Sequence, residues 1–180
     1  MPKAAPFIEV EPLNFDALAN KFGNSRELML ASLNSTLRKT GKLLVPQIKA
    51  ETPRGATNKL ANSTVFQVLG RAEDMRMEIR QSAFSTDGFP YGKAVRTGTK
   101  PHFPPIDPLI PWVMKKLGVA GSEAHQVAFL VARKISKVGT KAQPYHITVF
   151  NRNSSKLKEM LGDAVGQVMV KLADLPKGKS

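Results

Sequence analysis

The longest regular pattern of hydrophobic residues in the chain has the spacing of an α-helix. Apolar or small side chains recur there every three or four residues: Leu30, Leu33, Leu37, Gly41, Leu44 and Ile48. This spacing lines one face of a helix, and Ser25 is expected to cap its N-terminus. Pro46 falls inside the pattern and should kink the helix or end its regular part, because its ring removes one backbone hydrogen bond. We expect Pro53 and Gly55 to stop the helix.

The segments that follow have the composition and period of β-strands. Residues 62–69 (NSTVFQVL) are rich in β-branched and aromatic side chains. Apolar and charged residues alternate from Met75 to Arg80, which is typical of a half-buried antiparallel strand. Glu78 is expected on its polar side, in a cross-strand pair at the surface. We expect a third strand at Ala94 to Thr97 and a fourth at His146 to Phe150.

Three later segments predict helices. The first is residues 109–117. The second begins at a cap, Ser122, and ends at Gly139; its expected buried stripe is Ala124, Val127, Ala128, Val131, Ile135 and Val138. The third begins at residues 153–155, and its expected buried face is Leu157, Leu161, Ala164, Val168, Leu172 and Leu175.

This order of elements predicts an α+β fold, a small antiparallel sheet of three to four strands with helices packed on one face. Residues 1–24 are expected to form an extended N-terminal arm that docks loosely or adds an edge strand at residues 7–10. Residues 25–175 would form a single α+β domain, and residues 176–180 a tail. A chain of 180 residues is long enough to bury a core of its own.

The stretch from Phe89 to Gly118 (FPYGKAVRTGTKPHFPPIDPLIPWVMKKLG) is dense in proline. Each ring fixes φ at about −65° and favours extended geometry before it, so the segment is stiff without a hydrogen-bond ladder. Two interpretations remain open: the segment presses against a partner, or it packs on the core of its own chain. The candidate interface residues are Phe103, Pro104, Pro105, Ile106, Leu109 and Trp112.

The net charge of +13 is concentrated in the second half of the chain. Residues 1–90 hold 12 Lys and Arg against 9 Asp and Glu, whereas residues 91–180 hold 15 against 5. Such a surface attracts polyanions without sequence preference, and a surface that meets an acidic protein has the same composition. The candidate contacts with DNA or an acidic partner are Arg96, Lys100, Arg133, Lys134, Lys137 and Lys141.

No motif for catalysis or metal binding stands out. The chain has no cysteine, which excludes disulfides and thiolate chemistry. The histidines lie far apart, outside any metal-ligand spacing: His102, His125 and His146. Glu73, Asp74 and Glu78 are the only acids clustered near a strand, too few to favour a metal-dependent nuclease. We therefore expect no enzyme activity, no metal and no cofactor.

No apolar run approaches the ~20 residues that cross a bilayer, and the first six residues lack the apolar core of a signal peptide. We expect no membrane partner, and a protein that stays in the cytoplasm where it is made unless a particle carries it out.

Several short motifs follow one another in a fixed order. A helix within residues 33–55 (LNSTLRKTGKLLVPQIKAETPRG) ends in Thr-Pro before a turn, and a Leu-x-x-Ser sequence opens the sheet at residues 60–63. Residues 91–102 (YGKAVRTGTKPH) run into a Gly-Thr-x-Pro-His loop. A proline-rich loop then enters a Trp-containing helix at residues 102–118, and residues 127–145 end in Gly-Thr-x-Ala-x-Pro before Tyr145.

In this order, over about residues 26–175, these motifs resemble the tail-completion or head-tail joining proteins of the neck of tailed bacteriophages. The chain departs from that family's pattern at Arg54-Gly55, which a longer insertion at residues 56–59 follows, and at Arg96, where many members have an acidic residue.

The resemblance implies a structural subunit of the virion neck, assembled in the host cytoplasm. It would form a ring, a hexamer, around the DNA channel, beside a tail terminator or tail tube protein and a head-side stopper or adaptor. Double-stranded DNA would pass nearby without base reading. The alternative is a generic basic nucleic-acid-binding module, with a metal-dependent nuclease third.

Overall fold

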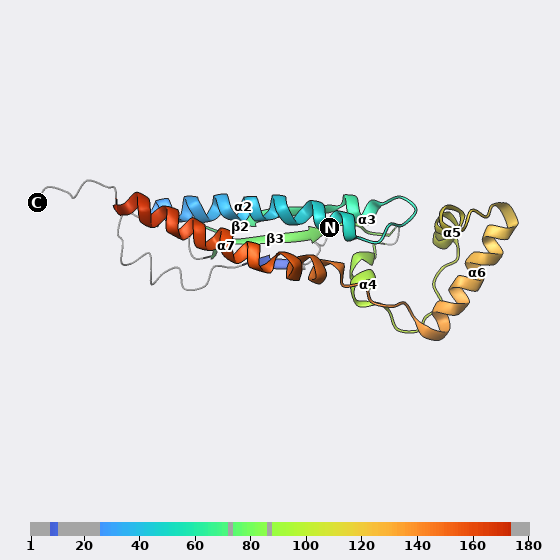
Figure 1. The fold of residues 1–180 in the computed structure, drawn as a ribbon. Helices are drawn as coiled ribbons and strands as arrows, with labels where there is room; N and C mark the ends of the chain where they lie inside the picture. Colours follow the sequence, from blue (N-terminus) through green and yellow to red (C-terminus); the bar gives the residue numbers. More distant parts are fainter. Residues whose placement is uncertain (1–7, 11–25, 72–73, 86–87, 174–180) are drawn as a thin grey trace, which may run out of the picture. The chain divides into compact units, whose positions relative to one another are not determined.

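The computed structural model describes residues 8–10, 26–71, 74–85 and 88–173 and confirms an α+β fold (Figure 1). Its elements follow in this order: β1 (Ile8–Val10), α2 (Arg26–Glu51), α3 (Lys59–Asn62), β2 (Thr64–Leu69), β3 (Arg76–Gln81), α4 (Tyr91–Thr97), the 3-10 helix η3 (Asp107–Leu109), α5 (Ile110–Leu117), α6 (Gly121–Val138) and α7 (Tyr145–Ala173).

The described strands form one sheet in the order β1-β3-β2. β1 runs antiparallel to β3, with Glu9 opposite Glu78 in the register. Residues 8–10 therefore add an edge strand, which was one of the two interpretations of the N-terminal arm. The rest of the expected arm and the expected tail at 176–180 lie outside the described residues, as does the expected cap Ser25.

The strand expected at Ala94 to Thr97 is wrong, because these residues belong to helix α4. The hydroxyl of Thr97 donates to the carbonyl of Lys93 four positions earlier, and Gly98 ends the helix. A Cβ at Gly92 would lie 3.0 Å from a methyl of Leu60, so the small residue lets the first turn of α4 approach α3 closely. Contact with α3 therefore outweighs the weak β-propensity of this short segment.

The strand expected at His146 to Phe150 is also wrong, since α7 runs without interruption from Tyr145. Pro144 directly precedes the helix, a position where its missing N–H costs nothing. Tyr145, Val149 and Leu157 are buried, which matches a helical stripe that begins eight residues before the predicted start. Ala164 and Val168 continue that stripe.

The other helices and strands differ from the predicted boundaries by only a few residues. α2 continues through Pro46 to Glu51, so the proline does not end the helix. α6 begins at Gly121 with Ala120 at its cap, and Ser122 lies inside it. Residue 62, expected at the start of a strand, belongs to the short helix α3.

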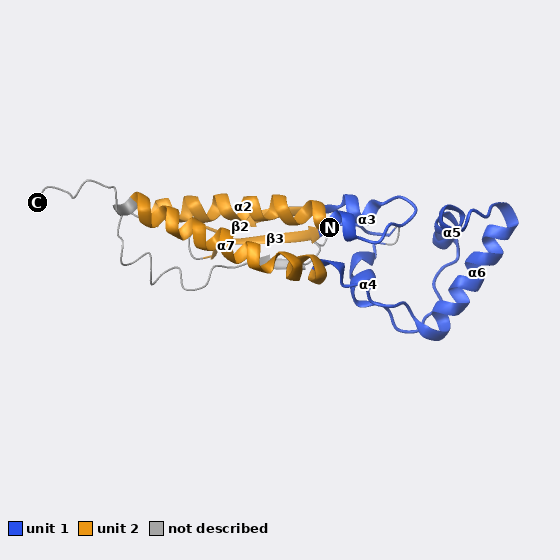
Figure 2. Cartoon of the chain, viewed as in Figure 1, with its two compact units in different colours: residues 1–4, 49–64, 81–146 blue, residues 5–48, 65–80, 147–180 orange. Residues whose placement is uncertain are grey.

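The contacts divide the chain into two units (Figure 2). In the second unit, which includes the described residues 8–10, 26–48, 65–71, 74–80 and 147–173, hydrogen bonds join α2 and α7 side by side. Ser32 Oγ donates to the Ala164 carbonyl at 3.1 Å, and the amides of Gln47 and Asn153 exchange bonds of 3.2 and 2.8 Å. A Cβ at Gly41 would overlap the Phe66 ring, so this glycine admits the close approach of α2 to β2.

The first unit includes the described residues 49–64, 81–85 and 88–146. Within it, η3, α5 and α6 have a small core of their own, formed by Val113, Ala124 and Ala128. We call residues 99–140, which comprise these three elements, the α5–α6 hairpin.

Candidate interaction site on the hairpin

The two ends of the α5–α6 hairpin are held together by a pair of identical dipeptides, Gly98-Thr99 and Gly139-Thr140. Thr99 N–H donates to the Thr140 carbonyl at 3.1 Å, and Thr140 N–H donates to the Thr99 carbonyl at 3.2 Å. The two threonine hydroxyls are also 3.0 Å apart. This antiparallel bridge, the Gly-Thr clasp, closes the hairpin at its base.

Both glycines of the clasp are needed for their conformation and for their size. Their φ angles are +71° and +70°, a region that side chains disfavour. A Cβ on Gly98 would overlap the carbonyl of Thr140, and one on Gly139 would overlap the carbonyl of Thr99. The backbones meet only because neither residue has a side chain.

The six predicted interface residues divide into two groups. Ile106, Leu109 and Trp112 are half-buried and pack against the hairpin core. Phe103 is 52% exposed, and its ring centroid lies 6.0 Å from that of Phe129 on α6. Pro105 is exposed and Pro104 half-buried. Packing on the core of its own chain is therefore found for a part of the proline-rich segment, and contact with a partner stays a prediction for the exposed part.

Helix α6 has an inverted distribution of side-chain size. Its fully buried positions are all alanines, at 124, 128 and 132, whereas Phe129 is 43% and Leu130 58% exposed. An amphipathic helix ordinarily turns its large apolar side chains toward the core. The expected burial of Val138 is wrong for the same helix, since it is 67% exposed.

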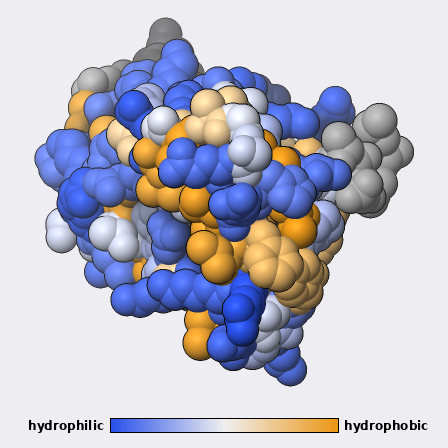
Figure 3. Space-filling view, turned by 90° about the vertical axis from the view of Figure 1, so that its right-hand side faces the viewer, coloured by the Kyte–Doolittle hydropathy of each residue, from blue (hydrophilic) through white to orange (hydrophobic). Residues whose placement is uncertain are grey.

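Figure 3 shows the face of the first unit on which α5 and α6 lie. Hydrophobic side chains gather near its middle, and hydrophilic side chains surround them. The exposed large apolar residues of the hairpin are Phe103, Met114, Leu117, Phe129, Leu130 and Val138.

The predicted cationic residues also divide. Arg133, Lys134 and Lys137 are exposed on α6, close in sequence to Phe129 and Leu130. Lys100 and Lys141 are exposed next to the Gly-Thr clasp. Their placement leaves them accessible to a polyanion or an acidic protein.

Arg96 differs from the other predicted cations, because it is half-buried in α4. One of its guanidinium nitrogens donates to Gln81 Oε1 at 3.4 Å.

Gln81 is the centre of a buried polar cluster in the first unit. Its amide nitrogen donates to the hydroxyls of Thr52 and Thr64 at 3.3 and 3.0 Å, and the Tyr145 hydroxyl donates to its amide oxygen at 2.5 Å. All four residues are buried. The cluster joins the residue that follows α2 to β2, β3 and α7, and it satisfies polar groups that would otherwise destabilise the interior.

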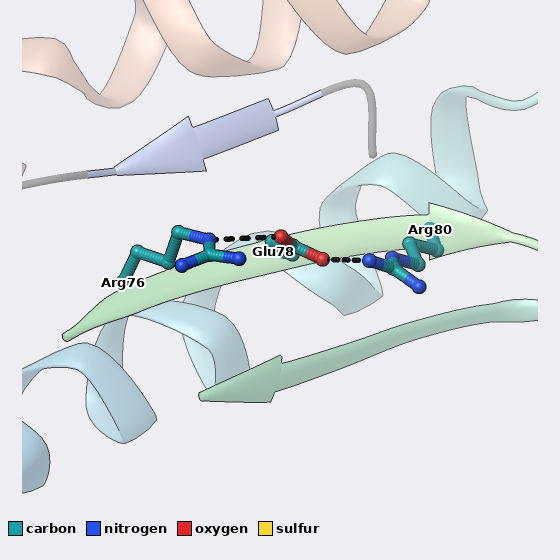
Figure 4. A network of polar contacts seen from close by, with 3 residues as sticks. All are labelled: Arg76, Glu78 and Arg80. Atoms are coloured by element: carbon teal, nitrogen blue, oxygen red, sulfur yellow. Dashed lines mark hydrogen bonds and ion pairs between the residues drawn. The ribbon is translucent and has the colours of Figure 1, made fainter. Parts of the chain in front are cut away.

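Glu78 lies between two arginines of its own strand (Figure 4). Its carboxylate accepts a 3.0 Å hydrogen bond from Arg76 and a second bond from Arg80. Burial would raise the pKa of Glu78, but the bonds and charges of the two arginines outweigh it and lower the pKa. Glu78 is only 3% exposed, so the prediction of a cross-strand pair at the surface is wrong.

Each of the three histidines has its own surroundings in the structure. His102 Nδ1 is 2.9 Å from the Lys100 carbonyl, and His125 is exposed on α6. Burial and the charge of Arg96 lower the pKa of His146, which favours its neutral form. Among the described residues, no three His, Asp or Glu side chains gather as metal ligands, and no helix is long and apolar enough to span a membrane.

Comparison with models of protein families finds no match, and neither curated proteins nor solved structures yield one.

Sequence reasoning did not single out Phe129, Leu130 or Gln81. Phe129 and Leu130 follow the buried Ala128 directly, and no periodic signal distinguishes a second apolar face from the first. The signal that was present is the alanine spacing at 124, 128 and 132, which leaves the larger residues off the buried stripe.

Proposed function

We propose that the protein is a structural subunit of the neck of a tailed bacteriophage. It would complete the tail and join it to the head as one copy in a sixfold ring around the DNA channel. Its neighbours would be a tail terminator or tail tube protein and a head-side stopper or adaptor. It would act by shape and charge, without a catalytic step.

The observation that carries this proposal is the Gly-Thr clasp. The Gly-Thr-x-Pro-His and Gly-Thr-x-Ala-x-Pro motifs belong to the sequence pattern that resembles neck proteins, and Thr99 and Thr140 pair directly. Two motifs of one pattern that meet in space support a shared architecture more strongly than either motif alone.

The hairpin surface supports a role in assembly. A ring subunit must present two unlike surfaces to its neighbours, because only a heterologous contact that closes on itself makes a ring. Phe103 and Leu130 are exposed on an element with its own core, as a docking surface requires. We take the sheet of this subunit to have its helices on one face, which the bonds between α2 and α7 support.

The test is to delete the gene from the parent phage and to examine the lysate by electron microscopy. The proposal predicts filled heads and tails that are not joined, and joined particles again when the protein is supplied in trans. Joined, infectious particles without the protein would refute it.

The second candidate, a nucleic-acid-binding module, is favoured by the net charge of +13 and the exposed cations of α6. Such a module would bind free duplex DNA as a monomer or dimer, with affinity that falls steeply as salt rises. A neck subunit would bind free duplex weakly and reach the DNA only as part of a ring.

A further inference from the structure

The outer face of α6 combines apolar and cationic side chains in one stripe. We use the name outer α6 face for Gln126, Phe129, Leu130, Arg133 and Lys137, all of which are exposed. Positions 126, 130, 133 and 137 follow one another at helical spacing and therefore lie on one side of the helix.

DNA alone does not account for this face. Phosphate contacts need cations and hydrogen-bond donors, and they gain nothing from an exposed leucine and phenylalanine. Leu130 and Phe129 lie within a turn of Arg133, so the complementary surface must supply apolar side chains and carboxylates together. That chemistry belongs to an acidic protein segment.

The chain itself contains such a segment. No Lys or Arg occurs between Lys3 and Lys21, and the acids there are Glu9, Glu11 and Asp16. Residues 8–10 are already used as strand β1. Residues 11–20 (EPLNFDALAN) keep Glu11 and Asp16 and add Leu13, Phe15 and Leu18, so their chemistry is the complement of the outer α6 face.

We propose that residues 11–20 of one copy bind the outer α6 face of a neighbouring copy. Glu11 and Asp16 would meet Arg133 and Lys137, while Phe15 would cover Leu130. The segment is tethered at Val10 and at Arg26, so at about 3.4 Å per residue it reaches at most about 25 Å from its ends.

The two halves of this contact are unlike, as a closed ring requires. The inference thus rests on the proposed function and names the contact between subunits. Opposite charges across such a contact also set its register, because a shifted partner would leave cations unpaired.

The absence of native cysteines makes the contact directly testable by cross-linking in the full-length protein. Phe15→Cys and Leu130→Cys are prepared as separate single-cysteine variants, mixed and oxidised, so that a mixed disulfide can form only between two copies. The matched control replaces Leu130→Cys with Val170→Cys, because Val170 on α7 is exposed to a similar extent, 62% against 58% for Leu130. We expect the Phe15–Leu130 pair to link roughly tenfold faster than the Phe15–Val170 pair, since docking raises the effective concentration.

Charge reversal provides a second arm. Adding Glu11→Lys and Asp16→Lys to the Phe15→Cys variant should remove the rate advantage. Adding Arg133→Glu and Lys137→Glu to the Leu130→Cys variant should restore the rate advantage. Misfolding of either variant could not produce such a rescue. Equal rates for the two cysteine pairs, or reversal without rescue, would overturn the inference.

The same assay also detects other possible binding partners of the outer α6 face. Protection of the Leu130→Cys thiol by a short DNA duplex at about 150 mM salt, or by phosphatidylserine vesicles, without any Phe15 link, would assign the face to nucleic acid or to lipid and overturn the inference. A protein that carries both cysteines and forms the disulfide within one chain at high dilution would overturn the requirement for a second copy.

The contact and the proposed function can fail separately. If rings form without the Phe15–Leu130 link, the contact is refuted and the neck function is not. If the link forms but neither rings nor joined particles do, only the function is refuted.

Discussion

The hydroxyl of Tyr145 donates a 2.5 Å hydrogen bond to Oε1 of Gln81, 64 positions earlier in the chain, and both side chains are buried. The bond connects the first residue of α7 to the last residue of β3. The bond thus fixes the start of α7 against the end of the sheet strand.

Tyr145→Phe should therefore destabilise the protein by about 1–2 kcal/mol, because a buried acceptor loses one of its donors while the ring remains. Urea unfolding followed by circular dichroism measures the loss. Tyr91→Phe is the matched control: burial raises the pKa of Tyr91, but its hydroxyl makes no hydrogen bond with the described residues. An equal loss from both variants would contradict the role of the Gln81 cluster.

Glu78→Gln should cost about 2 kcal/mol, because Arg76 and Arg80 lose the carboxylate that they share. Glu159→Gln is the control, since Glu159 pairs with Lys156 at 3.0 Å on the open surface, where an ion pair contributes little.

The same substitution should change the pH dependence of unfolding. The folded-state pKa of Glu78 lies below 4.5, so its contribution is complete above that pH and is lost as the pH falls through the lowered pKa. Urea titrations at a series of acidic pH values should show this loss in the wild type and a smaller one in Glu78→Gln. Parallel acid limbs would contradict the assignment.

Gly139→Ala should destabilise the α5–α6 hairpin more than Gly118→Ala. Both glycines have a φ near +70°, but only at Gly139 would a Cβ overlap backbone, whereas Gly118 has open space around it. We expect about 1 kcal/mol at Gly118 from conformation alone and a clearly larger loss at Gly139. Limited proteolysis within residues 99–140, together with urea unfolding, compares the stability of the two variants. Equal losses of stability in Gly139→Ala and Gly118→Ala would show that the Gly-Thr clasp contributes nothing.

Phe103→Ala and Trp112→Ala separate assembly from stability. Trp112 packs on the hairpin core, so its removal should lower stability by up to about 3 kcal/mol. Phe103 is half-exposed, so Phe103→Ala should leave the urea midpoint within about 0.5 kcal/mol of the wild type and still reduce the yield of joined particles. Unchanged particle yield with Phe103→Ala would remove this residue from the interface.

Neutralising Arg133, Lys134 and Lys137 together to Gln should reduce particle yield or the retention of DNA, because these exposed cations lie on α6 without carboxylate neighbours at 124–158. The control neutralises the exposed Lys39, Lys42 and Lys158, which removes the same charge elsewhere. Infectivity is measured on matched lysates of the two triple variants. An equal loss of infectivity in both would mean that only the net charge matters.

The sequence predicted the long helix, the alternation in β3 and the helix after the proline-rich loop, because each has a strong local period. It failed at Ala94 to Thr97 and at His146 to Phe150, where short β-branched segments become helices through contacts with distant residues. Gly92 against Leu60 and Tyr145 with Gln81 are such contacts, and no window of local sequence contains both partners. The candidate interaction site could be predicted only in part for the same reason: the proline content indicated the loop, but only the fold shows that Leu130 is exposed.

The most direct test of the central claim is electron microscopy of the purified full-length protein, followed by gold labelling of parent particles that carry an epitope-tagged version of it. A neck subunit predicts closed rings in solution or, once incorporated, label at the junction of head and tail. A protein that stays monomeric at every concentration, and whose label is missing from mature particles, would contradict it.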